Sequence, residues 1–262
     1  MELQGKTALI TGGNSGIGLA AARMMLAQGA RVAITGRDRA KLDEAATELG
    51  GDVLALRADL NRADDLAEVV RAVGARFGTL DIVFANAGIS GPTPLGSTTY
   101  EAFQDIVDTN LTSVFFTVQA VLPLLREGSA IVLNGSVMRE LAVGGTAAYS
   151  ASKAAITGMA KVFATELAPR GIRVNTVIPG ATRTPIWTRG ARAGATLDAT
   201  EAYLAPRIPL GRLSDADEVA HAVVFLASPR ASGITAAEIV VDGGTIGAPS
   251  GGAIFRGSPS AR

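Results

Sequence analysis

The chain opens with a strand, a glycine-rich turn, a helix and a second strand, and this order restricts its fold more than any other feature. An apolar run, Thr7–Ile10, leads into the turn Thr11–Gly18, and the helical stretch Leu19–Gln28 follows. Arg31–Thr35 is the second strand and completes a βαβ unit. Such a unit presents backbone N–H groups and a helix N-terminus to a phosphate group. The candidate phosphate-binding residues are Gly12, Asn14, Ser15, Gly16, Ile17 and Gly18.

The residues after the second strand indicate which dinucleotide the turn would hold. Where an NAD-binding chain has an acidic residue against the ribose 2′-hydroxyl, this chain has Gly36 and Arg37. A glycine leaves room for a 2′-phosphate and an arginine can pair with it, so we expect NADP to be favoured over NAD. In the alternative interpretation, Arg37 is a solvated loop residue and Asp38 binds the 2′-hydroxyl.

Further strands and helices alternate along the rest of the chain. The strands are predicted at 53–56, 81–84, 130–133, 172–178 and 239–241. The helices are predicted at 39–49, 63–77, 100–125 and 149–167, and a last helix follows the capping signature at 214–217 and ends at 227. Open α/β sheets bind ligands at the carboxyl ends of their strands. The residues expected at these ends are Asp59, Leu60, Asn86, Ala87, Gly88, Ser136, Pro179 and Gly180. Asp59 either hydrogen-bonds an adenine amino group or merely begins the next helix.

Tyr149 and Lys153 are the strongest candidates for chemistry. They lie four residues apart, so on a helix they share one face, one turn apart. A neighbouring ammonium lowers the pKa of a phenol from its ordinary value of about 10, and a tyrosine tuned in this way can exchange a proton with a carbonyl or alcohol. The pair also occurs by chance in many helices. Here the pair begins an apolar stripe that continues through Ile156 and Phe163, so this face of the helix is expected to be buried. Burying a charged lysine costs free energy, which favours a functional role for Lys153.

Two polar residues near this pair have both a functional and a structural interpretation. Ser136 follows a strand, where serine is common in turns, but it could also hydrogen-bond a reacting oxygen. Asn110 lies in an apolar helical run, so its amide needs partners. It either braces a kink in that helix or holds a water molecule.

The chain is predicted to be one domain, because no linker divides it. Residues 1–245 form the dinucleotide-binding and catalytic domain, and residues 181–213 within it form a long substrate loop. Residues 246–262, rich in glycine and serine, are expected to be a flexible tail.

Composition excludes several classes of function. The formal net charge is zero, which is untypical of proteins that bind nucleic acid or anionic membranes. With no cysteine and one histidine, thiol chemistry and a His-rich metal site are excluded, and we expect no metal. We expect no signal peptide, because the residues from Met1 lead directly into a strand-like run, and no apolar run reaches the roughly 20 residues of a membrane span. A cytoplasmic protein is expected.

These residues together resemble the short-chain dehydrogenase/reductase family from about Leu3 to Gly244. The motifs that match are Thr11-Gly12-x-x-x-Gly16-Ile17-Gly18, Asp59, Asn86-Ala87-Gly88, Asn110, Ser136, Tyr149-x-x-x-Lys153, Pro179-Gly180 and Asp242-Gly243. The resemblance implies a single Rossmann-type, doubly wound α/β domain with a seven-stranded parallel sheet and helices on both faces. It also implies a homotetramer or homodimer with subunit contacts through the helices at 100–125 and 149–167.

The resemblance implies catalytic roles as well. Tyr149 is the general acid in carbonyl reduction and the general base in alcohol oxidation. Lys153 lowers the pKa of Tyr149 and binds the nicotinamide ribose, Ser136 positions the substrate oxygen, and Asn110 anchors a water molecule linked to Lys153. Thr184 contacts the nicotinamide carboxamide.

The leading prediction is therefore an NADP-dependent oxidoreductase that reduces a small ketone or oxidises a secondary alcohol. One alternative is a 3-oxoacyl thioester reductase, which would need a basic surface for an acidic carrier protein; Arg126, Arg139 and Arg189 could contribute to one. Another is a cofactor-sensing regulator without turnover, but such a module has no need of Ser136, Tyr149 and Lys153 together.

Overall fold

One parallel sheet organises the molecule. The computed structural model describes residues 1–50, 52–188 and 196–256. The seven strands lie in the order β3-β2-β1-β4-β5-β6-β9, so the direction in which the sheet grows reverses between β1 and β4. Every neighbouring pair is parallel. The strands are β1 (Thr7–Ile10), β2 (Arg31–Gly36), β3 (Leu54–Arg57), β4 (Leu80–Ala85), β5 (Leu125–Asn134), β6 (Arg173–Pro179) and β9 (Glu238–Val241).

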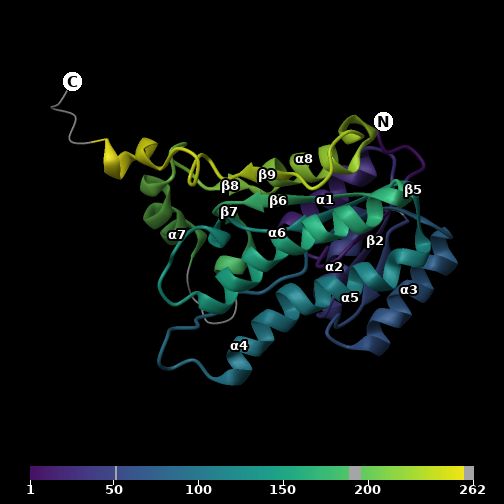
Figure 1. Ribbon diagram of the computed structural model, residues 1–262, viewed down its shortest axis with the longest axis horizontal. Coiled ribbons are helices and arrows are strands. Elements are labelled where there is room, and N and C mark those ends of the chain that lie inside the picture. The colour runs from purple at the N-terminus through teal and green to yellow at the C-terminus, as the bar shows by residue number, and fades with distance from the viewer. Residues whose placement is uncertain (51, 189–195, 257–262) are drawn as a thin grey trace.

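Helices cover both faces of this sheet (Figure 1). Apolar side chains of α1 (Gly16–Ala27), α2 (Arg39–Leu49) and α8 (Ala216–Ala227) form a core on one face. Those of α3 (Ala63–Phe77), α5 (Ser113–Val121) and α6 (Ala147–Leu167) form a second core on the other. Central strands such as β1 and β4 are buried along their whole length, as expected where helices lie on both sides. The doubly wound α/β fold predicted from the sequence is confirmed.

The long helix predicted from Tyr100 to Leu125 is interrupted. It consists of α4 (Tyr100–Val107), one π-helical turn at Asp108–Thr112, α5, and a 3₁₀ turn at Leu122–Leu124. Pro123 lies at the start of that 3₁₀ turn, where its missing N–H ends the α-helical pattern. Leu125 already belongs to β5, so the prediction extended the helix too far and began the strand too late.

The predicted substrate loop also contains regular structure that its sequence did not indicate. The strand β7 (Thr182–Arg183) lies within the loop and pairs in parallel with β8 (Ser214–Asp215), directly after its end, and a 3₁₀ turn follows β7 at Pro185–Trp187. The helix α7 (Leu197–Leu204) begins after Thr196, whose hydroxyl accepts a hydrogen bond from Ala199 N at 3.1 Å. This helix has no fully buried residue, so it lacks the apolar stripe by which a helix is recognised in a sequence. Arg189 and the rest of 189–195 lie outside the described residues.

The beginning of the predicted tail is packed on the body of the protein. Two 3₁₀ turns form at Pro249–Gly251 and Ala253–Phe255, and Arg256 donates a hydrogen bond to the carbonyl of Pro209 at 3.0 Å. Residues 257–262 lie outside the described residues. A flexible tail over the whole of 246–262 therefore remains a prediction.

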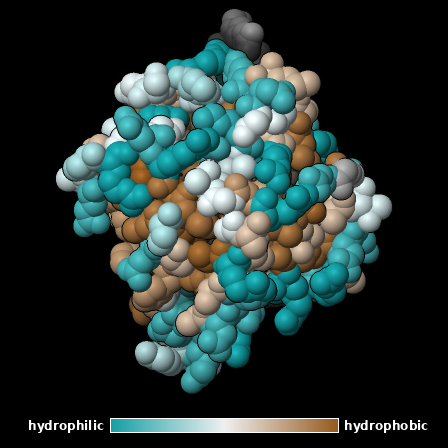
Figure 2. Space-filling view, turned by 90° about the vertical axis from the view of Figure 1, so that its right-hand side faces the viewer, coloured by the Kyte–Doolittle hydropathy of each residue, from teal (hydrophilic) through white to brown (hydrophobic). Residues whose placement is uncertain are grey.

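Figure 2 views the side of the molecule that carries the N-terminus, where apolar residues form a band bordered by hydrophilic ones. A buried carboxylate lies at this end of the sheet: Asp81 accepts hydrogen bonds from Thr7 N, Lys6 and Arg126. Burial alone would raise the pKa of Asp81, but these hydrogen bonds outweigh it and lower the pKa. This cluster joins β1, β4 and β5 at their amino ends, away from the carboxyl edge.

In the described part of the chain, no helix is long and apolar enough to cross a membrane.

Candidate active site

The carboxyl ends of β1, β4 and β5 are connected by a ladder of polar groups, which we call the amide ladder (Thr11, Asn86 and Asn134). The Thr11 hydroxyl accepts hydrogen bonds from the backbone N–H groups of Asn86 and Ala87, at 2.9 and 3.0 Å. Asn86 Nδ2 donates to the Thr11 carbonyl at 3.0 Å, and Asn134 Nδ2 donates to Asn86 Oδ1 at 2.9 Å. The ladder lies at the reversal point of the sheet, where α/β proteins of this architecture bind ligands.

The glycine turn beside the ladder has the geometry that a phosphate requires. Gly12 and Gly16 have φ of +63° and +53°, a conformation that favours glycine. A Cβ at Gly18 would collide with the carbonyl oxygen of Gly12, so this glycine permits a close approach of helix and turn. The first turn of α1 carries no acidic residue, so no negative charge competes at its N-terminus. Gly12, Gly16 and Gly18 fit a dinucleotide phosphate.

Lys153 and Tyr149 lie on α6 next to this edge. Lys153 is only 4% exposed, and its Nζ donates to the carbonyl of Asn134 at 2.7 Å. The same Nζ lies 5.9 Å from the centroid of the Tyr149 ring. Burial lowers the pKa of Lys153 from its ordinary value of 10.5 to about 8. The ammonium is thus held beside the phenol, with its charge near the point of titration at physiological pH.

Asn110 is fully buried in the π-helical turn between α4 and α5. Its Oδ1 accepts from Ile89 N at 2.8 Å, and its Nδ2 donates to Ile89 O at 2.9 Å and to Ser152 Oγ at 3.2 Å. The side chain therefore clamps the segment after β4 and ties it to α6. A Cβ placed on Gly88 would lie 3.2 Å from Asn110 Oδ1 and 3.6 Å from Lys153 Nζ, so these three residues are neighbours. Bracing is visible in these contacts; the water-anchoring role remains a prediction.

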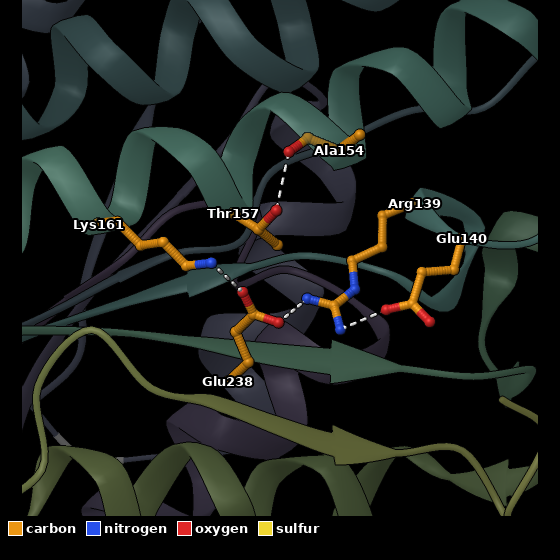
Figure 3. A pocket seen from close by; sticks show the side chains of 6 residues that line it. All are labelled: Arg139, Glu140, Ala154, Thr157, Lys161 and Glu238. Carbon is orange, nitrogen blue, oxygen red and sulfur yellow. Dashed lines mark hydrogen bonds and ion pairs between the residues drawn. The ribbon is translucent and has the colours of Figure 1, made fainter. Parts of the chain in front are cut away.

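Ser136 is buried directly after β5, and the turn that follows it packs against α6. Its hydroxyl accepts a hydrogen bond from Met138 N at 3.2 Å, which leaves its own proton available as a donor. The same turn ends at Arg139, which forms ion pairs with Glu238 at the start of β9 and with Glu140. Figure 3 shows this charged pocket, with Lys161 of α6 reaching the other oxygen of Glu238. Arg139 thus anchors the serine turn to β9 and takes no part in the reacting centre itself.

The predicted 2′-phosphate site lies at the ends of β2 and β3. Arg37 is exposed and forms no hydrogen bond or ion pair with any described residue. Asp38, in contrast, caps α2 by accepting from Lys41 N at 3.2 Å, and this backbone hydrogen bond lowers its pKa. A Cβ on Gly36 would lie within 3 Å of the Asn14 side chain, so Asn14 covers the backbone at this point. Asp59 accepts from Asn61 N at 3.1 Å, which supports a turn-forming role.

The remaining candidates either pack on the glycine turn or can contribute to a cofactor site only through the main chain. Thr184 is 9% exposed, and its side chain lies 3.0 Å from a Cβ placed on Gly16, so the segment after β6 packs directly on the glycine turn. Pro179 ends β6, and Gly180 lies where any Cβ would meet Asp242. Ile17 and Leu60 pack against the two cores, so their contribution to a cofactor site would come from the main chain. Ser15 precedes α1, and Ala87 and Gly88 lie in the irregular segment directly after β4.

Asn134 and Ile89 were not predicted as site residues, and Thr11 was predicted only as part of the glycine-turn motif. Thr11 and Asn134 form the two ends of the amide ladder, and Ile89 is the partner of Asn110. Asn134 carries a signal that could have been used, since a polar residue ending a buried strand needs a partner. Nothing in the sequence indicates that Ile89 bonds to a residue 21 positions away.

A family profile described as "Enoyl-(Acyl carrier protein) reductase" matches residues 12–245. The chain is 40% identical over 245 residues to oxidoreductase asL5 of Sarocladium schorii, covering 93% of this chain and 96% of that protein. It is 38% identical over 246 residues to the 3-oxoacyl-(acyl-carrier-protein) reductase FabG of Escherichia coli, covering 93% and 98%.

Solved structures agree. A short-chain type dehydrogenase/reductase from Mycobacterium marinum superposes with a TM-score of 0.86 at 34% identity, covering 94% of this chain and 97% of that one. The chain belongs to the short-chain dehydrogenase/reductase family. It is therefore an oxidoreductase with the family's seven-stranded sheet.

Two further family members were solved with different cofactors. One is a 3-ketoacyl-(acyl-carrier-protein) reductase from Brucella melitensis complexed with NADH, with a TM-score of 0.85 at 34% identity over 93% of this chain and 99% of that one. The other is a short chain dehydrogenase from Burkholderia cenocepacia in complex with NADP, with the same TM-score and identity over 94% and 99%. Both dinucleotides thus occur on this scaffold.

Proposed function

We propose that the chain reduces a ketone to a secondary alcohol with NADPH, and catalyses the reverse oxidation. The observation that carries this is the placement of Tyr149 and the buried ammonium of Lys153 beside the glycine turn, at the reversal point of the sheet. A bound reduced nicotinamide supplies the hydride to the carbonyl carbon. The protein supplies the proton, orients the ketone and keeps water away.

The proton comes from the Tyr149 hydroxyl, which leaves a phenolate as the carbonyl oxygen becomes an alcohol. The ammonium of Lys153 stabilises that phenolate, because a positive charge in a buried site interacts strongly with a nearby negative one. The Ser136 hydroxyl can donate a hydrogen bond to the same carbonyl oxygen and polarise it.

The direct test replaces Tyr149 by Phe. The variant loses the proton donor but keeps the ring, so kcat for ketone reduction should fall by about 10²- to 10⁴-fold while cofactor affinity changes little. Tyr100→Phe, at an exposed position on α4, serves as the matched control and should keep full activity. Full turnover by Tyr149→Phe would contradict the proposed role of Tyr149.

Arg37 supports the preference for NADPH. Its guanidinium is exposed at the end of β2, whereas Asp38 is engaged in capping α2. We expect a higher kcat/KM with NADPH than with NADH, and Arg37→Asp should reverse this order by repelling the 2′-phosphate. Arg39→Ala is the control, because Arg39 is exposed two positions further on and pairs with Asp43. A wild-type kcat/KM for NADH equal to that for NADPH would overturn this preference. Gly36→Asp is a poorer test, since any side chain there displaces Asn14.

A 3-oxoacyl thioester is the second candidate substrate, because the Escherichia coli relative that bears this name aligns over 98% of its length. The arginines expected to bind an acidic carrier protein give this candidate little support. Arg126 pairs with Asp81 at the amino end of the sheet, and Arg139 is bound to Glu238 and Glu140. Kinetics with acetoacetyl-CoA and ethyl acetoacetate separate the two candidates. A kcat/KM at least tenfold higher for the thioester would favour it over a simple ketone.

A cofactor-sensing regulator without turnover remains the third candidate. It predicts tight NADPH binding and no consumption of NADPH with any carbonyl substrate. The buried ammonium of Lys153 disfavours it, because a binding module gains nothing from a charge that is costly to bury.

We also propose that the chain assembles as a homodimer or homotetramer through α4, α5 and α6. Large apolar side chains are exposed there, among them Phe103, Phe115, Phe116 and Val162, which are 40 to 53% exposed. Phe115 contacts both Phe116 and Phe163, with ring centroids 5.3 and 5.7 Å apart. An exposed apolar surface of this kind is typical of protein interfaces.

A further inference from the structure

The segment after Thr245 lies outside the match to the family profile, which ends at residue 245. Asp242 fixes its start, because its two carboxylate oxygens accept hydrogen bonds from Gly244 N at 2.7 Å and Ile246 N at 2.8 Å. The chain then runs as two 3₁₀ turns to Arg256. We call residues 246–256 the strap.

The strap packs on the segment that follows α7. Gly252 is buried against it, and a Cβ there would lie 3.0 Å from the carbonyl oxygen of Arg207. Arg256 closes the contact with two hydrogen bonds, one to the strap's own Gly251 carbonyl at 2.7 Å and one to the Pro209 carbonyl at 3.0 Å. Residues 253–255 contact residues 205–207, directly after α7, and in Figure 1 the yellow end of the chain lies near this helix.

The segment held by the strap is linked in turn to the site. Glu201 of α7 forms an ion pair with Arg183, the residue before Thr184, and accepts a hydrogen bond from Leu213 N at 3.3 Å. Thr184 packs on the glycine turn. A continuous path of contacts therefore runs from Arg256 through α7 to Thr184 and the glycine turn.

From these contacts we infer that the strap is a positioning element that holds α7 and residues 205–213 over the substrate side of the active site. This inference rests on the proposed ketone reduction. Loosening the strap raises KM for the ketone, because α7 must then be ordered when the substrate binds. It leaves kcat and the KM for NADPH nearly unchanged, because the hydrogen bond that holds the strap runs to Pro209 and not to the reacting centre.

The test compares Arg256→Ala and Gly252→Ala with the wild type, using the full chain. Gly247→Ala is the matched control, since a Cβ at Gly247 meets nothing within 4 Å. We expect KM for ethyl acetoacetate to rise about three- to tenfold in the first two variants. Arg256→Ala loses the hydrogen bond to Pro209, a loss of this size, and Gly252→Ala places a Cβ against the Arg207 carbonyl and pushes the strap away. Gly247→Ala should behave like the wild type. An unchanged KM in both variants, or a fall in kcat equal to the rise in KM, overturns the inference.

Hydrogen exchange of the backbone amides in 197–210 provides a second readout that needs no turnover. Exchange should become faster in Arg256→Ala and Gly252→Ala and stay unchanged in Gly247→Ala. Unchanged exchange in all variants would show that the strap does not hold α7. If the wild type reduces no ketone, the proposed function fails and the substrate role of the strap fails with it, while the exchange data still decide whether the strap orders α7.

Discussion

At the scale of single residues, the most consequential feature is a lysine that is both buried and charged near neutral pH. Burial lowers the pKa of Lys153 to about 8, against an ordinary value of 10.5. Below pH 8 the folded protein carries an ammonium that the unfolded chain would solvate better, so the charge opposes folding. Between pH 8 and 10.5 the folded state has lost this proton while the unfolded state still holds it, and stability rises with pH.

We therefore predict a pH-dependent difference between the wild type and Lys153→Met. As pH rises from 8 to 10.5, the free energy of unfolding of the wild type should gain up to about 3 kcal/mol relative to the variant, since each unit of pKa is worth about 1.4 kcal/mol. Urea titrations at several pH values measure this gain. A difference that stays constant with pH would show that Lys153 is not desolvated in the folded state. The variant should also lose ketone reduction, because its Tyr149 no longer faces a positive charge.

Asn134 carries a second prediction at this scale. Its side chain holds Asn86, and Asn86 holds the carbonyl of Thr11 at the start of the glycine turn. Asn134→Ala removes the first of these bonds, so the turn loses support and the dissociation constant of NADPH should rise about three- to tenfold. Fluorescence titration of NADPH measures it. Asn61→Ala is the control, because Asn61 bonds to Thr109 at a different strand end; an equal effect in both variants would mean a general loss of stability.

At the scale of elements, the π-helical turn at Asp108–Thr112 shows what sequence patterns can and cannot predict. The apolar period predicted helix on both sides of Asn110, and the asparagine itself was predicted either to brace a kink or to hold a water molecule. The partner is Ile89, in a loop after a different strand, so no local pattern could name it. The same holds for Asn14 and Gly36, whose contact depends on how β2 meets the glycine turn. The inward stripe of α6, in contrast, follows from helical spacing alone, and Lys153 and Ile156 are buried as predicted.

If Asn110 braces this turn, its replacement should destabilise the protein before it affects chemistry. Asn110→Leu leaves Ile89 N and Ile89 O without partners, and each orphaned group costs about 1–3 kcal/mol. We predict a loss of about 2–5 kcal/mol in the free energy of unfolding, measured by urea denaturation. Thr112→Val, in the same turn but exposed, should lose less than about 1 kcal/mol. A stable Asn110→Leu variant with low kcat would instead favour the water-anchoring role.

At the scale of the whole molecule, the two cores bury the apolar side chains that face the sheet. The apolar side chains on the outer surface of α5 and α6 remain exposed in a single chain. The sheet is covered on both faces, so burial of further apolar area requires a second chain. Phe116 is 47% exposed, and its ring packs edge-on against Phe115. A glutamate at this position would place a charge in the centre of the proposed interface, where an unpaired charge is costly. Phe116→Glu is thus expected to weaken assembly without unfolding the subunit.

Sedimentation equilibrium tests this expectation. The wild type should have a mass that is twice or four times the 26.6 kDa of the chain, and Phe116→Glu should shift it to a smaller species. Leu95→Glu introduces the same charge at a fully exposed loop position and should leave the mass unchanged. A monomeric wild type would rule out the interface. A variant that keeps the wild-type mass would place the contact elsewhere, because a tight apolar interface does not accept a buried carboxylate without a partner.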